Sequence, residues 1–377
     1  MHTAISNKRA IVAASRPAMS VAFIVNGDQE SPMGYRAREF GARLPYDIRI
    51  GYRSQRKFIS ILRFLVFLAR VRPSLTYVFD ISYSGVVSAA LHKLIFRNFL
   101  IIETGDAITE LVRATGRRGK VGLWLTRLLE KSALRIADRI VVRGSLHQRW
   151  LSQQGVAADV IQDGVDTRSV KPEDAGKLRR ELGLDDVLTV GLVGSSVWSE
   201  KQQMCYGWDL VETLTLLKDK PVKGIMIGDG SGIAHLKARC REHGIEDNIL
   251  FIGRVPFARL NQYLSVIDIC LSTQTNDLVG QVRTTGKLPL YLAAGRFVLA
   301  SNVGEAAMVL EKEMLVDYEG VKDEQYPRKL KTRILEILQR PELLRRGASN
   351  VSLAREHFDY GVLAQRMTKV IDATQSE

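Results

Sequence analysis

The stretch Arg283-Thr-Thr-Gly-Lys-Leu-Pro-Leu-Tyr-Leu-Ala-Ala-Gly-Arg-Phe-Val-Leu-Ala-Ser301 combines a polar loop, a helix and a strand. Pro289 is tolerated in the first turn of a helix and Gly295 suits a helix end, so we expect a helix over Lys287–Ala294. The apolar run Phe297–Ser301 then predicts a buried strand. A helix that leads directly into a buried strand is typical of α/β folds.

The same alternation of strand and helix continues through the chain in both directions. In the second half, strands are predicted at Leu188–Val193, Lys223–Ile227, Ile249–Ile252 and Ile267–Leu271, with helices near Gly207–Leu217, Ile233–His243, Phe257–Leu264 and Glu305–Leu310. In the first half, strands are predicted at Ser20–Gly27, Leu75–Phe79, Phe99–Ile102 and Arg139–Val142, with helices near Tyr35–Leu44, 57–70, Gly85–Phe96 and Gly119–Ile136. Strands separated by helices of this length indicate parallel sheets with right-handed crossovers.

The length of 377 residues suits two domains. We expect a first domain over 1–165, with 1–17 as a loose tail, and a polar, turn-rich linker over 166–186. The second domain is expected over 187–350. Residues 351–377 are expected to form a C-terminal helix that packs back on the first domain.

The charge of the chain is concentrated in its first half. The 54 Lys and Arg outnumber the 41 Asp and Glu, for a net charge of +13. Residues 1–165 hold 25 basic and 12 acidic side chains, whereas 166–377 hold 29 of each. The first domain is therefore expected to meet something anionic, such as a membrane surface, a nucleic acid or a phosphorylated substrate. The three cysteines form no CxxC pair, which excludes a disulfide scaffold and a zinc ribbon.

The most apolar segment, Phe58–Ala69, is too short to span a bilayer and contains Arg63. The N-terminus lacks the continuous apolar stretch of a signal peptide, so we expect a cytoplasmic protein. Arginines flank this segment, and a second basic cluster runs from Arg113 to Arg127. Two interpretations stay open: a buried crossover helix with basic ends, or a helix that places the protein peripherally on the inner face of an anionic membrane.

Two glycine-containing loops follow predicted strands of the second half, where parallel sheets bind ligands. Their backbone N–H groups are candidates for binding phosphate. These candidates are Gly194, Ser195 and Ser196 in the first loop, and Gly228 and Gly230 in the second. Neither loop matches GxGxxG or the P-loop, and glycines that simply make tight turns are the alternative.

The loop before the predicted helix at 287 offers a second group of candidates. Thr284 or Thr285 suits the N-cap, and Gly286 leaves free N–H groups at the helix start. The ammonium of Lys287 opposes the helix dipole there, and Arg283 adds a second cation. An anion bound at this point would relieve the repulsion; a simply solvated lysine is the alternative.

Five ordered motifs resemble the retaining GT-B glycosyltransferases of family four (glycosyl transferases group 1). They lie at Leu129–Val142, Val160–Pro172, Ile227–Gly230, Leu250–Pro256 and Ala293–Gly304. The resemblance implies two Rossmann-like domains that face a cleft, with a nucleoside diphosphate sugar held mainly by the second. It implies that this sugar donor is a co-substrate and that no metal or other cofactor is needed.

The resemblance also assigns positions to individual residues. Arg254 and Val255 would lie at the base, and Thr284, Thr285 and Gly286 at the diphosphate. Gly34 would lie where the first glycine loop of the family meets donor and acceptor.

The chain departs from the family at its charged positions. The two family glutamates fall on Val282 and Leu290, and the Arg and Lys that neutralise the diphosphate fall near Ser195 and Tyr206. Lys201, Arg283 or Lys287 could replace the lost cations, because the position of a charge matters more than its origin in the chain. The frequent catalytic histidine is missing from residues 101–106, where Glu103 and Asp106 remain to orient the acceptor or the sugar.

These observations predict transfer of a sugar from a nucleoside diphosphate sugar to a hydroxyl with retention, in glycan, polysaccharide or glycolipid synthesis. Glu103, Asp106 and Lys287 are the candidate catalytic residues, and the basic first domain favours an anionic or lipid-linked acceptor. The alternatives are a nucleotide-sugar-binding protein with lost or altered transfer and a GT-B sugar epimerase. A nucleic-acid binder is not expected, because no recognition motif accompanies the basic clusters.

The tryptophans are expected to pack within the fold rather than to bind sugar. They are Trp124, Trp150, Trp198 and Trp208. Trp198 follows the Ser195–Ser196 loop and is kept as a candidate for ligand contact.

Overall fold

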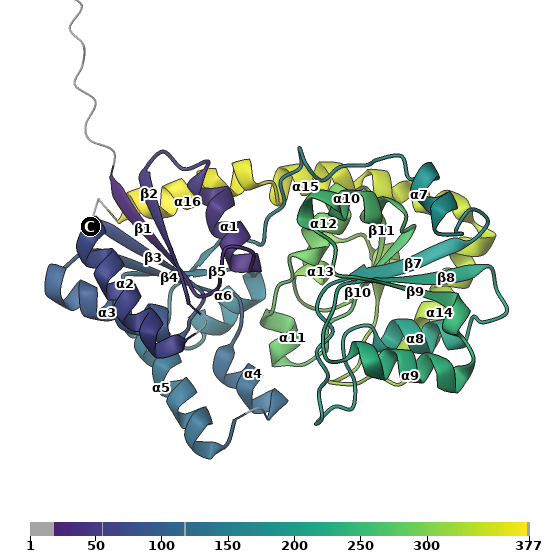
Figure 1. Ribbon diagram of the computed structural model, residues 1–377, viewed down its shortest axis with the longest axis horizontal. Helices are drawn as coiled ribbons and strands as arrows, with labels where there is room; N and C mark the ends of the chain where they lie inside the picture. Colours follow the sequence, from purple (N-terminus) through teal and green to yellow (C-terminus); the bar gives the residue numbers. More distant parts are fainter. Residues whose placement is uncertain (1–18, 55, 117, 375–377) are drawn as a thin grey trace, which may run out of the picture.

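The computed structural model describes residues 19–54, 56–116 and 118–374, which form two α/β domains side by side (Figure 1). The tail expected over 1–17 lies outside the described residues. Each domain is built on a six-stranded sheet whose neighbouring strands run parallel. Parallel strands need helical crossovers, and these cover both faces of each sheet.

The sheet of the N-terminal domain has the order β2-β1-β3-β4-β5-β6. Its strands are β1 (Ser20–Val25), β2 (Asp47–Tyr52), β3 (Leu75–Phe79), β4 (Phe99–Thr104), β5 (Arg139–Val142) and β6 (Asp159–Val160). The helices along this part of the chain are α1 (Pro32–Gly41), α2 (Lys57–Val71), α3 (Tyr83–Phe96), α4 (Ile108–Thr115), α5 (Lys120–Ile136) and α6 (Ser145–Ser152).

The sheet of the C-terminal domain has the order β12-β11-β10-β7-β8-β9. Its strands are β7 (Leu188–Val193), β8 (Val222–Ile227), β9 (Ile249–Gly253), β10 (Ile269–Ser272), β11 (Phe297–Ser301) and β12 (Leu315–Val316). The α-helices from residue 176 onward are α7 (Gly176–Glu181), α8 (Trp208–Thr215), α9 (Ile233–His243), α10 (Phe257–Ser265), α11 (Leu278–Val282), α12 (Lys287–Ala293), α13 (Gly304–Val309), α14 (Tyr326–Gln339), α15 (Asn350–His357) and α16 (Tyr360–Ala373). Short 3-10 helices cover Glu246–Asn248, Lys312–Met314 and Pro341–Ala348.

The buried strands follow the prediction closely, because each is a continuous apolar run. β3, β5, β7 and β11 have the predicted bounds, as does α9, and α16 lies within the segment 351–377 that was expected to form a C-terminal helix. The edge strand β2 was not predicted, since it alternates polar and apolar residues and is only half-buried. α4, α6 and α14 were also not predicted.

The helix α1 begins three residues earlier than predicted. Ser31 caps it by accepting a hydrogen bond from the Gly34 N–H (3.1 Å), and Pro32 occupies the first turn. Both residues favour a helix start at this point. The polar segment 166–186, which was expected to be a linker, contains the short helix α7.

The last helix returns to the N-terminal domain. α16 buries Leu363, Met367 and Ile371 against a core that includes Phe23 and Tyr77, on the same face of the sheet as α1. On the opposite face, α2, α3, α5 and α6 pack over a second core. The C-terminal segment is therefore part of the N-terminal core, although nearly two hundred residues of the other domain precede it.

The chain crosses between the domains twice, and the two crossings lie together. Val165 pairs with the returning chain: its N–H donates to Phe358 O (2.9 Å), and the Tyr360 N–H donates to Val165 O (3.1 Å). Asp359 caps α16 and also accepts from the N–H (3.1 Å) and hydroxyl (2.6 Å) of Thr167. The Asp359 side chain therefore links the two segments that cross between the domains.

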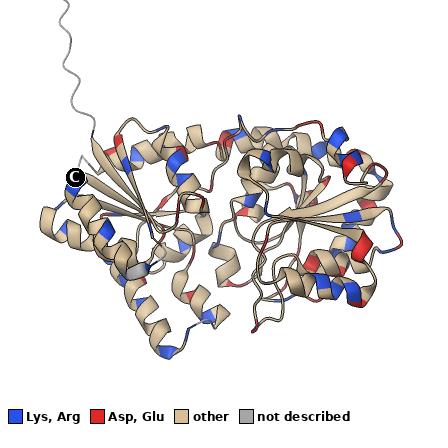
Figure 2. Ribbon diagram, in the orientation of Figure 1, with Lys and Arg blue, Asp and Glu red and all other residues tan. Residues whose placement is uncertain are grey.

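Lys and Arg residues are distributed over the helices of both domains (Figure 2). Within the described ranges, no helix combines the length and the apolar character needed to cross a bilayer.

The packing of α16 leads to a stability prediction. Ile371→Ala is expected to lower the free energy of unfolding by about 2–5 kcal/mol, because it leaves a cavity in the N-terminal core. Urea unfolding followed by circular dichroism measures the change. Lys369→Ala, at an exposed position of the same helix, is the matched control. Equal stability of the two variants would contradict a structural role for α16.

Candidate functional site

The carboxyl ends of strands from both sheets meet at the seam between the domains. Three polar contacts cross it. Arg283 Nε lies 2.8 Å from Asp106 Oδ1, and the Thr284 hydroxyl donates to Asp163 Oδ2 (2.7 Å). Ser145 donates its N–H (3.1 Å) and hydroxyl (3.0 Å) to Glu305 Oε2. Parallel sheets bind ligands at these ends, so the seam is the candidate site.

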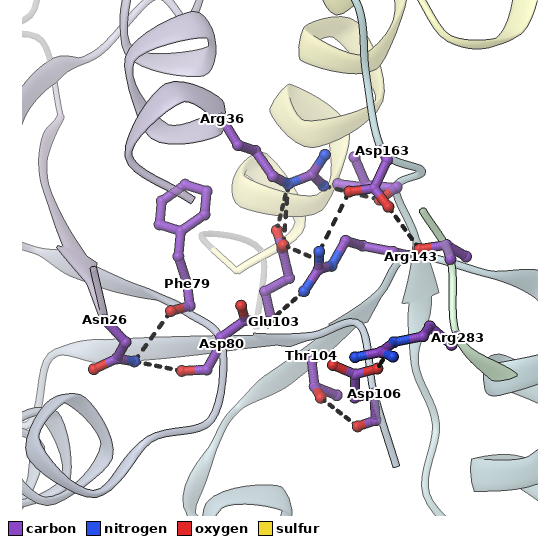
Figure 3. Close-up of polar contacts among 12 residues, drawn as sticks. Asn26, Arg36, Phe79, Asp80, Glu103, Thr104, Asp106, Arg143, Asp163 and Arg283 are labelled. Atoms are coloured by element: carbon purple, nitrogen blue, oxygen red, sulfur yellow. Dashed lines mark hydrogen bonds and ion pairs between the residues drawn. The ribbon is translucent and has the colours of Figure 1, made fainter. Parts of the chain in front are cut away.

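A buried charge network supports the N-terminal side of the seam (Figure 3). Glu103, at the end of β4, is fully buried and accepts from Arg36 Nε (3.0 Å) and from the Tyr77 hydroxyl (2.7 Å). Arg143 Nε lies 3.5 Å from the same carboxylate. Arg36 also donates to the backbone oxygens of residues 161 (2.9 Å) and 162 (2.6 Å). Buried charges are tolerated when they are paired and hydrogen-bonded in this way.

The second arginine connects this network to the seam. Arg143 contacts Asp80 and lies 3.3 Å from Asp163 Oδ1. Burial alone would raise the pKa of Asp163, but Arg143 and Arg36 outweigh it and hold that pKa below its ordinary value. Asp163 is thus kept ionised while it accepts from Thr284 of the other domain.

This arrangement changes the expectation for Glu103. Both of its oxygens are occupied by arginine and tyrosine, and no part of the side chain is exposed. A direct contact with acceptor or sugar is therefore not favoured, and we assign Glu103 a positioning role. Asp106 lies at the rim, partly exposed, where it pairs with Arg283. It is the predicted carboxylate that faces the second domain.

Lys287 occupies the centre of the C-terminal side. Its Nζ lies 3.5 Å from the ring centroid of Tyr206, and its side chain runs close to the Cα of Gly194. The Tyr206 ring is fixed because its hydroxyl donates to Leu271 O (3.0 Å) at the end of β10. Gly194 has φ +145°, and a side chain there would collide with Lys287. The cation is thus held between the ends of β7 and β10, where the strand order of this sheet reverses.

The environment of Lys287 disfavours its charge. Burial, and secondly the nearby Arg283, lower the pKa of Lys287 from 10.5 to about 7. Among the residues that the structure describes, no carboxylate makes an ion pair with it. The ring of Tyr206 supplies only a cation–π contact. A cation that is partly removed from water and has no counter-ion costs free energy that a bound anion would recover.

The start of α12 differs from the prediction. Gly286 is the N-cap, and no side chain caps the helix. The expectation that Thr284 or Thr285 is the cap is therefore wrong. The Thr284 hydroxyl donates a hydrogen bond to Asp163 instead. Thr285 lines a narrow cavity at the seam together with Arg143 and Glu305.

The two glycine-containing loops pack on each other. The N–H groups of Gly194, Ser196 and Gly228 already donate to backbone oxygens of residues 227, 229 and 253 (2.8–3.0 Å), and the Gly230 N–H donates to Asp229 Oδ1 (2.7 Å). A Cβ on Gly228, whose φ is +132°, would lie 2.0 Å from Gly194 O. Tight packing accounts for these glycines, and the exposed Ser195 is left at the tip of the first loop.

The remaining predicted residues lie on other loops and helices of the two domains. Arg254 and Val255 follow β9, directly after Gly253, whose oxygen accepts from Gly228; Arg254 is exposed and Val255 half-buried. Lys201 is exposed on a loop close to Gly116 of the N-terminal domain. Gly34 is buried in α1, where a Cβ would lie 2.3 Å from Asp28 O.

The two positions on which the family glutamates fall hold apolar side chains that pack within the protein. Val282 is almost fully buried, and Leu290 packs against the C-terminal core. Trp198, the candidate for ligand contact, stacks on His235 with ring centroids 3.9 Å apart. Trp124 is largely exposed, so the expectation that it packs within the fold is wrong.

Sequence reasoning missed several residues of the seam, namely Arg36, Arg143, Asp163, Ser145 and Glu305. Arg143 and Ser145 directly follow a predicted strand, which was the available signal. Asp163 lies within one of the family-like motifs. Nothing local marks Arg36, because its partners come from distant parts of the chain.

Comparison with known proteins identifies the kind of fold and domain. Residues 188–340 match the family model described as glycosyl transferases group 1. The D-inositol 3-phosphate glycosyltransferase of Segniliparus rotundus is 26% identical over 259 residues, which cover 65% of this chain and 54% of that protein. The match thus spans about half the length of that relative.

Two solved structures resemble almost the whole chain. Anabaena HepE in complex with UDP-glucose has a TM-score of 0.75 at 16% identity and covers 94% of this chain and 100% of its own. Sucrose-phosphate synthase from Thermosynechococcus elongatus has a TM-score of 0.76 at 15% identity, with 95% and 99% covered. The predicted GT-B fold, with two Rossmann-like domains, is confirmed.

The buried network leads to a second stability prediction. Glu103→Gln is expected to lower the free energy of unfolding by about 3–5 kcal/mol, because it leaves Arg36 and Arg143 without their shared carboxylate. Urea unfolding at pH 7 tests this. Glu110→Gln, which removes an exposed ion pair with Arg113, is the control and is expected to cost less than about 1 kcal/mol. A loss for Glu103→Gln as small as that of the control would contradict the assignment.

Proposed function

We propose that this chain is a glycosyltransferase, because residues 188–340 match the family model described as glycosyl transferases group 1 and the chain has a GT-B fold. It transfers a sugar from a nucleoside diphosphate sugar to a hydroxyl with retention of anomeric configuration. The donor lies on the C-terminal side of the seam and the acceptor on the N-terminal side. The charge excess of residues 1–165 favours an anionic or lipid-linked acceptor.

The observation that carries this proposal is the half-buried ammonium of Lys287, which makes no ion pair with a carboxylate of the described residues. It lies at the switch point of the C-terminal sheet, beside the loop that follows β7. A diphosphate placed there would supply the missing counter-charge. Anabaena HepE, which shares the fold, is a protein with UDP-glucose bound. We infer a ligand of the same chemical class here.

The position of Lys287 also supports the proposal that it replaces a lost cation. The resemblance to the family places one of its diphosphate-binding cations near Tyr206, and the Nζ of Lys287 lies over the ring of Tyr206. In this proposal α12 supplies the positive charge through Lys287. Arg283 lies on the same loop and is held by Asp106 in a partly exposed ion pair. Such pairs are weak, so the guanidinium is free to exchange onto a phosphate.

In the proposed reaction the oxygen of the acceptor hydroxyl bonds to the anomeric carbon, the bond from that carbon to the diphosphate breaks, and the hydroxyl proton passes to the leaving diphosphate. Negative charge then builds on the leaving diphosphate, where Lys287 and Arg283 stabilise it. Asp106, released from Arg283, orients the acceptor hydroxyl. Glu103 acts indirectly, through the arginines that position this edge of the sheet.

Removal of the Lys287 charge tests the donor site. Lys287→Met is expected to weaken UDP binding by about tenfold to a hundredfold, the loss of one or two charge-assisted hydrogen bonds. Isothermal titration calorimetry at pH 6.5 measures it. Lys237→Met is the matched control, because Lys237 also lies over an aromatic ring of this domain, 5.4 Å from the centroid of Phe251, but is exposed. Unchanged affinity in Lys287→Met would contradict the proposal.

The lowered pKa of Lys287 predicts two pH effects. The ammonium loses its proton as the pH rises through about 7, so UDP binding is expected to weaken above that pH in the wild type but not in Lys287→Met. Without ligand, the cost of burying the charge is fully present below pH 7 and is relieved towards pH 10.5. Lys287→Met is therefore expected to melt at a higher temperature than the wild type at pH 6. A lower melting temperature there would contradict the lowered pKa.

Metal removal gives a further prediction. Because Lys287 and Arg283 supply the positive charge at the diphosphate, excess EDTA is expected to leave the transfer rate unchanged. Loss of activity in EDTA that added Mg²⁺ restores would contradict this.

A panel of nucleoside diphosphate sugars separates the proposed function from its alternatives. A thermal shift identifies the donor, and release of nucleoside diphosphate with an added hydroxyl acceptor establishes transfer. The anomeric configuration of the product, read by NMR, tests retention. Isomerised donor without any acceptor would indicate an epimerase, and binding without turnover a nucleotide-sugar-binding protein.

A further inference from the structure

The first half of α5 projects from the N-terminal domain and presents apolar side chains to solvent. Val121, Trp124, Leu125 and Leu128 are 72%, 61%, 51% and 49% exposed. Their spacing of three, four and seven residues places them on one face of the helix. An exposed tryptophan within such a stripe is unusual for a surface that faces only water.

The two neighbouring helices extend this surface. α3 contacts both α2 and α5, and the three helices cover one face of the N-terminal sheet, away from the C-terminal domain (Figure 1). α2 exposes Ile59, Leu62 and Val66, while its Phe64 and Leu68 are buried in the core. α3 exposes Leu91, Leu94, Ile95 and Phe96. We call the exposed apolar residues of α2, α3 and α5 the apolar face.

The charges around the apolar face have one sign. The exposed cations on α2 and α5 include Arg63, Arg70, Lys120, Arg127, Lys131 and Arg135. In the described parts of α2, α3 and α5, the single carboxylate is Glu130. It is buried and accepts from the N–H groups of Ile108 (2.8 Å) and Thr109 (3.1 Å). The apolar face is therefore bordered by cations and by no exposed carboxylate of these helices.

We propose that the apolar face docks on the surface of an anionic phospholipid bilayer. Apolar side chains enter the boundary between headgroups and acyl chains, and the surrounding Lys and Arg contact lipid phosphates. Tryptophan prefers this boundary, because its ring is apolar and its N–H is polar. A soluble polyanion such as a nucleic acid would neutralise the cations but would not cover the exposed leucines, isoleucines and valines.

The position of the apolar face gives docking a consequence for the site. α5 is joined through α4 to Asp106, which pairs with Arg283 at the seam. α4 also contacts α11 of the C-terminal domain. A docked α5 therefore holds the seam near the membrane, where a lipid-linked hydroxyl acceptor can reach it. This consequence rests on the proposed function, whereas docking itself does not.

Vesicle co-sedimentation tests the docking. The full chain is expected to bind vesicles of phosphatidylcholine with phosphatidylglycerol at low salt, and to bind pure phosphatidylcholine vesicles much less. Trp124→Ser with Leu125→Ser is expected to lower the partition coefficient by about tenfold, as is Lys120→Glu with Arg127→Glu. Val321→Ser and Lys312→Glu, at exposed positions of the C-terminal domain, are the matched controls and should bind as the wild type does.

Tryptophan fluorescence gives a second readout. Anionic vesicles are expected to shift the emission to shorter wavelength through Trp124, and Trp124→Phe should lose that shift. All variants should keep the UDP affinity and circular dichroism of the wild type, which separates lost docking from lost folding or lost donor binding. Three results would overturn the proposal: no binding to anionic vesicles, equal binding of wild type and both double variants, or a dimer in solution that Trp124→Ser dissociates.

Discussion

Two buried arginines hold the carboxyl ends of the N-terminal strands in place, and the geometry of the seam depends on them. Arg36 and Arg143 share Glu103, and Arg143 reaches Asp163, which accepts from Thr284 of the other domain. Burying these charges is expensive unless every partner is present. The network therefore fixes the end of β4 and the segments after β5 and β6 in one arrangement. The loop at 283–287 is in turn placed against a rigid edge.

The two sides of the seam use charge in opposite ways. On the N-terminal side, buried carboxylates and arginines form ion pairs with one another. On the C-terminal side, half-buried Lys287 lies over Tyr206, with its pKa lowered to about 7 by loss of solvation and by Arg283. An uncompensated buried charge lowers stability, and proteins accept such a cost mainly at functional sites. This contrast is the physical basis for placing the donor diphosphate at Lys287.

The sequence predicted most of the fold because the buried strands are continuous apolar runs, as in Phe297–Ser301. It missed β2, where alternation at the sheet edge weakens the apolar signal. Loop candidates were predicted by residue type, but their roles depend on distant partners. Glu103 is enclosed by Arg36 and Arg143, and the N–H groups of the glycine loops already donate to nearby backbone and side-chain oxygens. The sequence did not show that Lys287 lies over Tyr206, because this contact depends on how α12 packs against the end of β7.

The pKa of the Lys287 side chain gives the most direct test of the proposed donor site. Its ε-ammonium pKa can be measured by NMR on protein with isotope-labelled lysine, assigned by comparison with Lys287→Met. We predict a pKa of about 7 in the free protein and a rise towards 10.5 when UDP is bound, because the diphosphate becomes its counter-ion. A pKa that UDP leaves unchanged would contradict the placement of the donor at this residue.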